Sequence, residues 1–467
     1  MERFIGNKAH ILSFPFPAQG HINPNLQFCK RLVAKGLKVT LITTISIGNT
    51  ISQIKPQVPG SDIDMEFISD GFDDPKKVEA QIAQDVDAYA ELFKVGVKQS
   101  LIKFLQTTRG WECPPKVLIY DSNLPWVQDV VGQFGLLGAA FFTASCAVAN
   151  IFHFANEGVV VKMPVEGQLS VPGLPLLETR DVPSFLHEVD AYPTILKLLL
   201  SQFDNLRRPK WVLFNSFDHL ENEVVKSLQS QWPIATIGPT IPSMYLDKRL
   251  KTDKDYGLHL LKPDTSATTT AWLNGKKDGS VIYISFGSLA NLSEEQAQEV
   301  AHALKNTHHP FIWVVREPEL KKLPADFIEN LSGKGLILSW CSQMEVLNHP
   351  AIGCFVTHCG WNSVLEALSA AVPLVAMPQW TDQPTNAKYV QDVWKVGIRV
   401  ETNQSGKLTG REEIHRCISE VMDEGHKRSE LRANAAKWKR LSVAAMDEGG
   451  SSDKNIIQFV TDVQCIL

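Results

Sequence analysis

The sequence predicts an α/β protein made of two doubly wound domains. Short β-rich runs alternate with helical stretches along nearly the whole chain, and this order is typical of parallel sheets with helices on both faces. A polar, charged segment without a strand pattern, Asp247–Tyr256, interrupts the alternation, which then starts again. With 467 residues the chain is also longer than one ordinary core requires.

The elements of the first domain follow from short apolar runs and from helical spacing of apolar residues. We expect strands at Ala9–Phe14, Leu37–Thr43, Lys116–Asp121, Leu137–Phe142, Trp211–Asn215 and Ile234–Ile237, with helical stretches at Pro24–Ala34, Val78–Leu105 and Trp126–Gln133. The same signals predict the second domain. Its strands are Val281–Phe286, Pro310–Val315, Gly335–Leu338, Ile352–Thr357 and Leu374–Ala376, and its helices are Glu294–Leu304, one from Asn362, Arg411–Val421 and Arg428–Leu441.

These elements divide the chain into four parts. We expect a first domain over residues 1–244, a linker over 245–262 and a second domain over 263–449. A last helix at Asn455–Val463, within residues 450–467, is expected to pack back on the first domain.

Charge and cysteine usage exclude several classes of protein. The formal net charge is −5, so neither nucleic acid nor an anionic membrane would be attracted. Eight scattered cysteines without a C-x-x-C pair indicate a reduced, cytosolic chain. Cys354 and Cys359 lie beside His358, but one strand end with these three side chains does not complete a tetrahedral metal set. We therefore expect no metal and no other cofactor.

Two segments of the chain could be a targeting or a membrane element. Residues 1–10 carry charged side chains and no apolar core, so they do not form a secretory signal. Leu136–Ala155 is apolar for nearly the length of a membrane span, although polar residues interrupt it. A buried strand that runs into a packed helix is the favoured interpretation, and we expect a cytoplasmic monomer.

The loop after the first strand holds a candidate general base. His21 follows a proline-rich loop and is expected just before a helix that Pro24 opens. The positive end of the helix dipole disfavours imidazolium, so a neutral imidazole is expected there. Asp121, at the end of another strand, could accept the ring N–H and fix its tautomer. The alternatives are a capping or packing role for His21 and an N-cap at the helix of Trp126 for Asp121.

Loops of the second half carry a set of residues suited to a nucleotide sugar. A strand ends near His358, Gly360 allows close backbone approach, and a helix N-terminus follows that can bind a diphosphate through its N–H groups. Other side chains in these loops offer a flat ring for a base, an amide for its edge, a carboxylate for ribose and polar groups for a hexose. They are Trp340, Gln343, Glu366, Asp382 and Gln383.

The segment Trp340–Gln383 resembles the signature box of the plant family 1 UDP-glycosyltransferases, which have the GT-B fold. The resemblance extends to the N-terminal P-x-P-x-Q-G-H loop, the Y-D-S-x-x-P-W segment around Asp121, Phe286-Gly287-Ser288 and Glu448–Ser452. One departure is Ala371, where the box usually has glycine before Val-Pro. A methyl group there would perturb the end of a helix if the position needs positive φ.

The resemblance implies two Rossmann-like domains that face each other across a cleft, and it assigns roles by position. His21 would be the base and Asp121 its orienting partner. Trp340 would stack on uracil, Gln343 would bond its edge and Glu366 would hold the ribose. The diphosphate would contact His358, Gly360, Asn362, Ser363 and Ser288, and the sugar would contact Trp361, Asp382, Gln383 and Thr143.

The expected reaction is an inverting, metal-independent transfer of glucose from UDP-glucose to a hydroxyl or carboxyl of a small phenolic, terpenoid or steroid in plant secondary metabolism. Gln383 favours glucose within the family. The alternatives are a non-catalytic nucleotide-sugar-binding protein and a GT-B enzyme that uses another UDP-sugar. Aromatic residues are the candidates for the acceptor pocket, namely Phe14, Phe16, Phe141, Phe142, Phe185 and Trp380.

Overall fold

The structure is a computed structural model that describes residues 9–51, 58, 61–261, 266–288, 290–331, 333–403 and 408–466. The predictions for residues 1–8 lie outside this range. The chain divides into two compact units, Met1–Leu260 with Ala444–Leu467 and Leu261–Val443. The segment expected as a linker is held in the first unit as far as Leu260, because Arg31 and Lys30 form ion pairs with Asp247 (2.9 Å) and Asp253 (2.7 Å).

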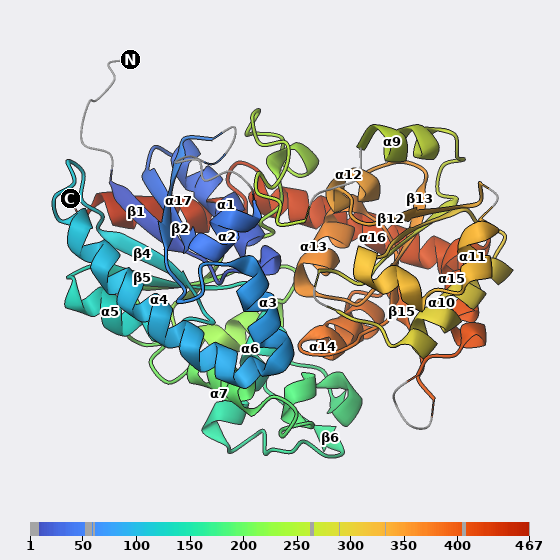
Figure 1. The fold of residues 1–467 in the computed structure, drawn as a ribbon, viewed down its shortest axis with the longest axis horizontal. Coiled ribbons are helices and arrows are strands. Elements are labelled where there is room, and N and C mark those ends of the chain that lie inside the picture. Colours follow the sequence, from blue (N-terminus) through green and yellow to red (C-terminus); the bar gives the residue numbers. More distant parts are fainter. Residues whose placement is uncertain are drawn as a thin grey trace. The chain divides into compact units, whose positions relative to one another are not determined.

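The first unit contains a seven-stranded sheet of order β3-β2-β1-β4-β5-β8-β9, in which every strand pairing is parallel (Figure 1). Its strands are β1 (His10–Phe14), β2 (Lys38–Thr44), β3 (Ile63–Ile68), β4 (Val117–Asp121), β5 (Leu137–Phe142), β8 (Trp211–Phe214) and β9 (Ile234–Thr236). A two-stranded antiparallel ladder is formed by β6 (Gln168–Leu169) and β7 (Leu177–Glu178). β3 was not predicted, since Asp64 and Glu66 interrupt its apolar pattern at the sheet edge.

Helices of the first unit connect these strands. They are α1 (Gln19–Ala34), α2 (Ile45–Thr50), α3 (Pro75–Gln84), α4 (Val86–Thr108), α5 (Val127–Gln133), α6 (Cys146–Glu157), α7 (Pro193–Ser201), α8 (Asn222–Gln229) and α17 (Ser451–Gln464), with one-turn 3₁₀ helices at Thr179–Asp181, Ser184–Leu186 and Ser243–Tyr245. The stretch predicted as one helix from Val78 is two helices, because Asp85 is extended (φ −161°) and caps α4 by accepting from Ala88 N (2.9 Å).

The C-terminal helix α17, at the red end of the chain, lies with the blue elements of the first unit (Figure 1). Phe459 packs on Phe28, with ring centroids 5.7 Å apart. Two further contacts fix the helix, since Ser452 Oγ donates to the carbonyl of Gly238 (2.6 Å) and Trp211 Nε1 donates to Asp462 (3.2 Å).

The second unit contains a six-stranded parallel sheet of order β12-β11-β10-β13-β14-β15. Its strands are β10 (Val281–Ser285), β11 (Phe311–Val314), β12 (Gly335–Leu338), β13 (Ile352–Thr357), β14 (Leu374–Ala376) and β15 (Gly397–Arg399). Its helices are α9 (Ser266–Asn274), α10 (Glu294–Asn306), α11 (Ala325–Glu329), α12 (Gln343–Leu347), α13 (Trp361–Ala370), α14 (Gln383–Lys388), α15 (Arg411–Met422) and α16 (His426–Met446), with a 3₁₀ helix at Glu317–Lys322 and a π turn at Tyr389–Val393. β15, a three-residue strand at the edge of the sheet, was not predicted.

The apolar stretch Leu136–Ala155 is a buried strand, β5, followed by the packed helix α6, as the sequence favoured. Among the described residues no helix has the length and apolar character needed to cross a membrane.

Candidate functional site

Three adjacent strands of the first sheet bring the predicted base and its partner together. β4 lies between β1 and β5, and the register pairs Phe14 with Tyr120 and Asp121 with Phe141. Because the strands are parallel, the loops that follow them leave the same edge of the sheet. His21 lies in the helix that follows β1, Asp121 is the last residue of β4, and Thr143 follows β5.

His21 lies inside the first turn of α1, not before the helix as the sequence predicted. The helix begins at Gln19, and Pro24 is inside it. The turn closes around the extended residue Ala18, whose carbonyl accepts from His21 N and Ile22 N (both 2.9 Å). A proline one turn into a helix removes only one backbone donor, so Pro24 does not mark the start.

His21 and Asp121 form a direct hydrogen bond. The ring Nδ1 lies 2.8 Å from Oδ2 of Asp121, whose other oxygen, Oδ1, accepts from Asn123 N at 3.0 Å. The Asp121 side chain is 0% exposed and that of His21 is 24% exposed. An ionised carboxylate only accepts, so Nδ1 carries the proton and the lone pair is on Nε2. Asp121 is not the N-cap of α5, because that cap is Trp126.

Thr143 contacts the same ring nitrogen. Its Oγ1 lies 2.9 Å from Nδ1 of His21. The Nδ1 proton is therefore shared between the carboxylate of Asp121 and this hydroxyl oxygen. The sequence assigned Thr143 to the sugar, and its contact with the base could not be read from one residue at the end of β5.

The predicted acceptor aromatics divide into two groups. Phe16 is partly exposed and packs on His21, with ring centroids 5.3 Å apart, and on Phe93 of α4 at 5.8 Å. Phe93 gave no signal in the sequence. The others in the first unit are core residues with little exposed surface, so their place in an acceptor pocket stays a prediction; they are Phe14, Phe141, Phe142 and Phe185.

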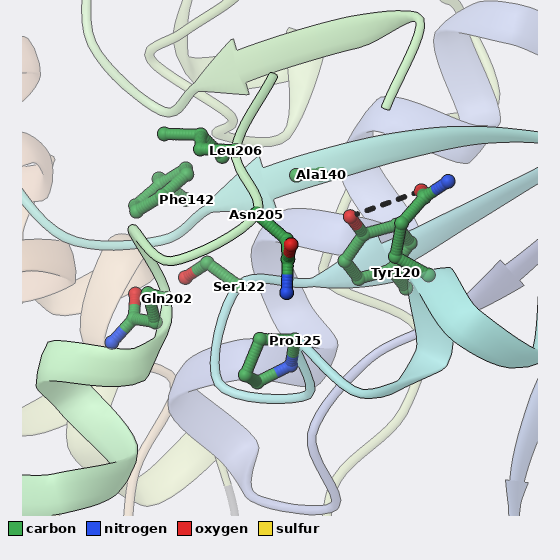
Figure 2. Close-up of a pocket in the computed structure, with 9 residues that line it drawn as sticks. Tyr120, Ser122, Pro125, Ala140, Phe142, Gln202, Asn205 and Leu206 are labelled. Atoms are coloured by element: carbon green, nitrogen blue, oxygen red, sulfur yellow. Dashed lines mark hydrogen bonds between the residues drawn. The ribbon is translucent and has the colours of Figure 1, made fainter. Parts of the chain in front are cut away.

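A small cavity lies beside the strand end of Asp121 (Figure 2). Tyr120 and Ser122 contribute to its lining, together with Pro125 and Asn205, and Tyr120 donates to Gln128 at 3.3 Å. Side chains alternate along a strand, so Tyr120 points to the face opposite Asp121. The volume of the cavity, about 10 Å³, is enough for one water molecule and too small for the expected acceptors.

In the second unit, the predicted donor residues follow the carboxyl ends of four strands. Ser288 follows β10, Trp340 follows β12, His358 follows β13 and Asp382 follows β14. Since β10, β13 and β14 are neighbours and all pairings are parallel, their loops gather at one edge of the sheet.

His358 is enclosed by two glycines. A Cβ atom at Gly287 would lie 2.7 Å from the ring, and one at Gly360 would lie 2.5 Å from Nε2, so neither position admits a side chain without movement. Gly287 also has φ +78°. Burial lowers the pKa of His358 to about 4, against a smaller opposing effect of a hydrogen bond to the backbone of Ser285. His358 is therefore neutral near pH 7 and offers a hydrogen bond, not a charge.

Helix α13 begins beside this ring. Its N-cap is Gly360, which has no side chain to accept from the first turn. The N–H groups of a first turn carry the positive end of the helix dipole. Asn362 and Ser363 are in this turn, which makes it suited to a diphosphate. Trp361 is buried, with its ring 6.1 Å from that of Trp394.

A hydrogen-bonded network links Gln343 to the predicted ribose ligand. Gln343 Nε2 donates to Ser363 Oγ (3.0 Å) and to Glu366 Oε2 (2.6 Å). Its Oε1 accepts from the hydroxyl of Tyr283 (3.0 Å). Tyr283 was missed because β10 has the sequence of an ordinary buried strand. The network holds the amide of Gln343 and the carboxylate of Glu366 in fixed orientations. Trp340, three residues before Gln343, is half-buried.

The loop after β14 is fixed by its own polar residues. Gln383 Oε1 accepts from the backbone N–H groups of Gln379 (2.9 Å) and Trp380 (3.1 Å), which directs its Nε2 group away from that backbone. Asp382 accepts from Thr381 Oγ1 (2.7 Å) and from Asn386 Nδ2 (2.8 Å). The half-buried Trp380 belongs to the second unit.

Arg316 supports the loop that carries Ser288. Its guanidinium donates to the carbonyls of Ser288 and Ala290, both at 2.8 Å. An arginine two residues after β11 belongs to no motif in the sequence, so this support was not predicted.

Cys354, Cys359 and His358 are the side chains that the sequence offers as an incomplete metal set. Cys354 and Cys359 are buried free thiols whose pKa values are raised above the ordinary range by burial. In the described part of the chain, metal-type side chains gather instead at His308, His309 and Asp423.

Comparisons with known proteins identify the family. Residues 228–432 match the family model "UDP-glucoronosyl and UDP-glucosyl transferase". The chain is 46% identical to "Mogroside I-E synthase" of Siraitia grosvenorii over 97% of both chains. It is 44% identical to "Flavonol 7-O-beta-glucosyltransferase UGT74F1" of Arabidopsis thaliana over 99% of this chain and 100% of that one.

A solved structure extends the likeness to the fold. Os79 from O. sativa, in complex with UDP, is 37% identical and has a TM-score of 0.90, with 97% of this chain and 100% of that chain covered. The chain has the GT-B fold and belongs to the plant family 1 UDP-glycosyltransferases, enzymes that transfer a sugar from a UDP-sugar donor to a small-molecule acceptor.

Proposed function

We propose that this enzyme transfers glucose from UDP-glucose to a hydroxyl or carboxyl group of a small hydrophobic acceptor, with inversion at the anomeric carbon. His21 acts as the general base and Asp121 orients it. The observation that carries this proposal is the 2.8 Å hydrogen bond from His21 Nδ1 to the fully buried carboxylate of Asp121.

The arrangement supports proton removal at Nε2. The carboxylate and Thr143 Oγ1 both lie against Nδ1, so the proton stays there and Nε2 accepts the proton of the acceptor hydroxyl. Asp121 stabilises the imidazolium that forms. The oxygen then attacks the anomeric carbon opposite the departing UDP, and such a base contributes about 10²–10⁴-fold. An acceptor carboxylate is already ionised near pH 7, so its reaction needs the base less.

The donor residues supply electrostatic stabilisation of the leaving diphosphate. The first turn of α13 offers N–H groups and the helix dipole, and neutral His358 offers a donor beside them. Trp340 stacks on the uracil, and the network of Gln343 and Glu366 holds the nucleoside. Trp361, Asp382 and Gln383 contact the glucose. The proposed steps use only these groups, without a metal ion or other cofactor.

The acceptor class is proposed from the relatives and from the first unit. The names of two relatives refer to a mogroside and a flavonol, which supports a hydrophobic phenolic, terpenoid or steroid. Phe16 and Phe93 place aromatic surface next to the base. All eight cysteines are free, which supports the reducing cytoplasm. A monomer is proposed as the default state.

The test is a mass-spectrometric screen of purified enzyme with UDP-glucose and pooled phenolic, carboxylic, terpenoid and steroid acceptors. We expect a hexose mass shift with at least one pool, a β-linked product by NMR, and loss of the shift with alcohols in the His21→Ala variant. An α-linked product would contradict inversion. No shift with UDP-glucose but a shift with another UDP-sugar would overturn the donor assignment. UDP-glucose binding without any turnover would favour a non-catalytic binding protein.

A further inference from the structure

Two histidines and an aspartate form a cluster in the second unit that the transfer reaction does not use. His309 Nε2 lies 2.9 Å from Asp423 Oδ1, and His308 Nε2 lies 3.5 Å from the same oxygen. One ligand atom from each of the three residues lies within 4.8 Å of the others. The two imidazole rings stand side by side, with centroids 4.0 Å apart.

The cluster lies away from the donor residues of the same sheet. His308 and His309 come directly before β11, at its amino end, and Asp423 is the C-cap of α15. The donor residues follow the carboxyl ends of β10, β12, β13 and β14. In a parallel sheet the amino ends and the carboxyl ends of the strands lie on opposite sides, so the cluster is separate from the proposed nucleotide-sugar site.

Local hydrogen bonds fix the backbone at His309 and Asp423. His309 N donates to Thr307 Oγ1 (3.3 Å), and Asp423 N donates to the carbonyl of Ser419 (2.8 Å), the last turn of α15. His309 is mostly buried, with its side chain 13% exposed, whereas His308 is 76% exposed. The ligands therefore lie next to two structured elements, β11 and α15, and the side chain of His308 is open to solvent.

We propose that His308, His309 and Asp423 bind one divalent transition-metal ion, with Zn²⁺ as the best fit. Two imidazole nitrogens and one carboxylate oxygen suit Zn²⁺, and also Co²⁺ and Ni²⁺, better than Mg²⁺ or Ca²⁺, which prefer oxygen ligands. Tetrahedral zinc with ligand bonds of 2.0–2.1 Å spaces its ligands about 3.3 Å apart. The distances from Asp423 Oδ1 to His309 Nε2 (2.9 Å) and to His308 Nε2 (3.5 Å) bracket that spacing, and all three ligand atoms lie within 4.8 Å of one another.

Charged side chains near the cluster have opposite effects on the binding of a cation. Arg428 carries a positive charge near His309. This charge repels a cation, whereas the Asp423 carboxylate attracts it. Water fills the fourth position from the exposed side, where His308 faces solvent.

A bound ion would join the start of β11 to the end of α15. These elements are far apart in the chain, at residues 308–309 and 423, so the ion would stabilise the second unit without touching the transferred sugar. The role is structural and leaves the proposed transfer mechanism unchanged.

The experiment uses full-length, tag-free protein treated with a chelator, since a histidine tag would bind the same ions. Zn²⁺ is titrated by calorimetry, and Co²⁺ is followed by its visible absorption. We expect saturable binding of one ion per chain in the micromolar range or tighter, together with a higher unfolding temperature for the second unit. Asp423→Asn and His308→Ala should each weaken binding at least ~10-fold; both side chains are partly or largely exposed, so the variants should fold.

Two matched variants test the location. Glu424→Gln removes a carboxylate adjacent to the cluster, and His219→Ala removes an exposed histidine of the first unit; both should bind Zn²⁺ like the unmodified protein. Binding that does not saturate below millimolar concentrations, or that survives Asp423→Asn and His308→Ala, would overturn the proposal. Transfer activity with and without Zn²⁺ is measured in parallel, so this outcome is independent of the proposed function.

Discussion

The two units build their candidate sites in different ways. In the first unit three side chains from the carboxyl ends of separate strands and the first turn of α1 meet directly, since His21 Nδ1 contacts both Asp121 (2.8 Å) and Thr143 (2.9 Å). In the second unit the candidate residues hold one another and the backbone, as the network of Gln343 shows. A site of the first kind depends on one group, whereas a site of the second kind distributes its binding energy over many. Substitutions should therefore affect turnover in the first unit and donor affinity in the second.

The largest effect is expected for His21→Ala. Loss of the base should lower kcat for alcohol acceptors by ~10²–10⁴-fold, with an unchanged Kd for UDP, because the proposed UDP contacts belong to the other unit. Steady-state kinetics and UDP calorimetry measure the two quantities. Thr143→Val is the matched control: it removes one contact of the ring but keeps the base and Asp121, so its loss should be far smaller. A loss of UDP affinity in His21→Ala would contradict the assignment of turnover to the first unit and donor affinity to the second.

The next effect is a dependence of stability on pH that comes from His358. Burial lowers its pKa to about 4 from the unfolded value of 6.5, so between these values the unfolded chain binds more protons than the folded chain. The stabilisation is complete above pH 6.5 and is lost as the pH falls towards 4, by about 3 kcal/mol in total. His358→Gln should remove this part of the pH dependence.

Other histidines also have lowered pKa values, so the quantity to compare is the difference between wild type and variant. Denaturant unfolding of both proteins at pH 7 and pH 5 provides it. If the two proteins lost equal stability between these pH values, His358 would not be buried in its neutral form.

A third test adds a methyl group beside His358. The Cβ atom of Gly287→Ala would lie 2.7 Å from the ring, and φ is +78°, so the ring must move from the start of α13. We expect UDP binding to weaken ~10-fold or more, which corresponds to about 1.4 kcal/mol. Gly333→Ala is the control, since Gly333 also has positive φ (+71°) but no heavy atom within 4 Å. Equal UDP affinity in Gly287→Ala and wild type would show that the ring does not contact the donor.

The same contrast explains what could be predicted from the sequence. β13 and β14 were predicted with their observed bounds, because buried central strands are short apolar runs between turn residues. Of the edge strands, β12 and β9 were also predicted. The edge strands β3 and β15 escaped, since an edge needs less apolar surface and leaves no clear period. The predicted start of helix α1, Pro24, is five residues after the observed start at Gln19, because a proline is typical of a first helical turn but here lies inside the helix.

The candidate site shows a similar limit. The donor residues are contiguous in the chain and were found together, whereas Tyr283 and Arg316 support them from strands and loops that carry no motif. The pairing of His21 with Asp121 was expected from their places at strand ends. The contact of Thr143 with the same nitrogen depends on the register of β5 beside β4, which composition and spacing do not encode.

A smaller effect is expected for Gln383→His. The Gln383 carbonyl oxygen accepts from two backbone N–H groups of its loop, and its amide NH2 group is the proposed donor to a sugar hydroxyl. Histidine cannot reproduce both sets of bonds, so the preference for UDP-glucose over UDP-galactose should fall by up to ~10-fold, about one hydrogen bond. Competition assays with the two donors measure the ratio. An unchanged ratio would separate this residue from sugar choice.

The smallest effect is expected at the far end of α13, for Ala371→Gly. Ala371 has φ +63° and ψ +37°, the left-handed conformation that the family's usual glycine adopts without strain. Relief of that strain outweighs the extra flexibility glycine gives the unfolded chain, so we expect a net gain of about 0.5–1 kcal/mol. Thermal unfolding should shift upward by ~2 °C, while UDP affinity and turnover stay the same, because the donor contacts are at the opposite end of the helix. A changed Kd for UDP would mean that the helix N-terminus depends on how its C-terminus is capped, and the donor site would then extend along the whole of α13.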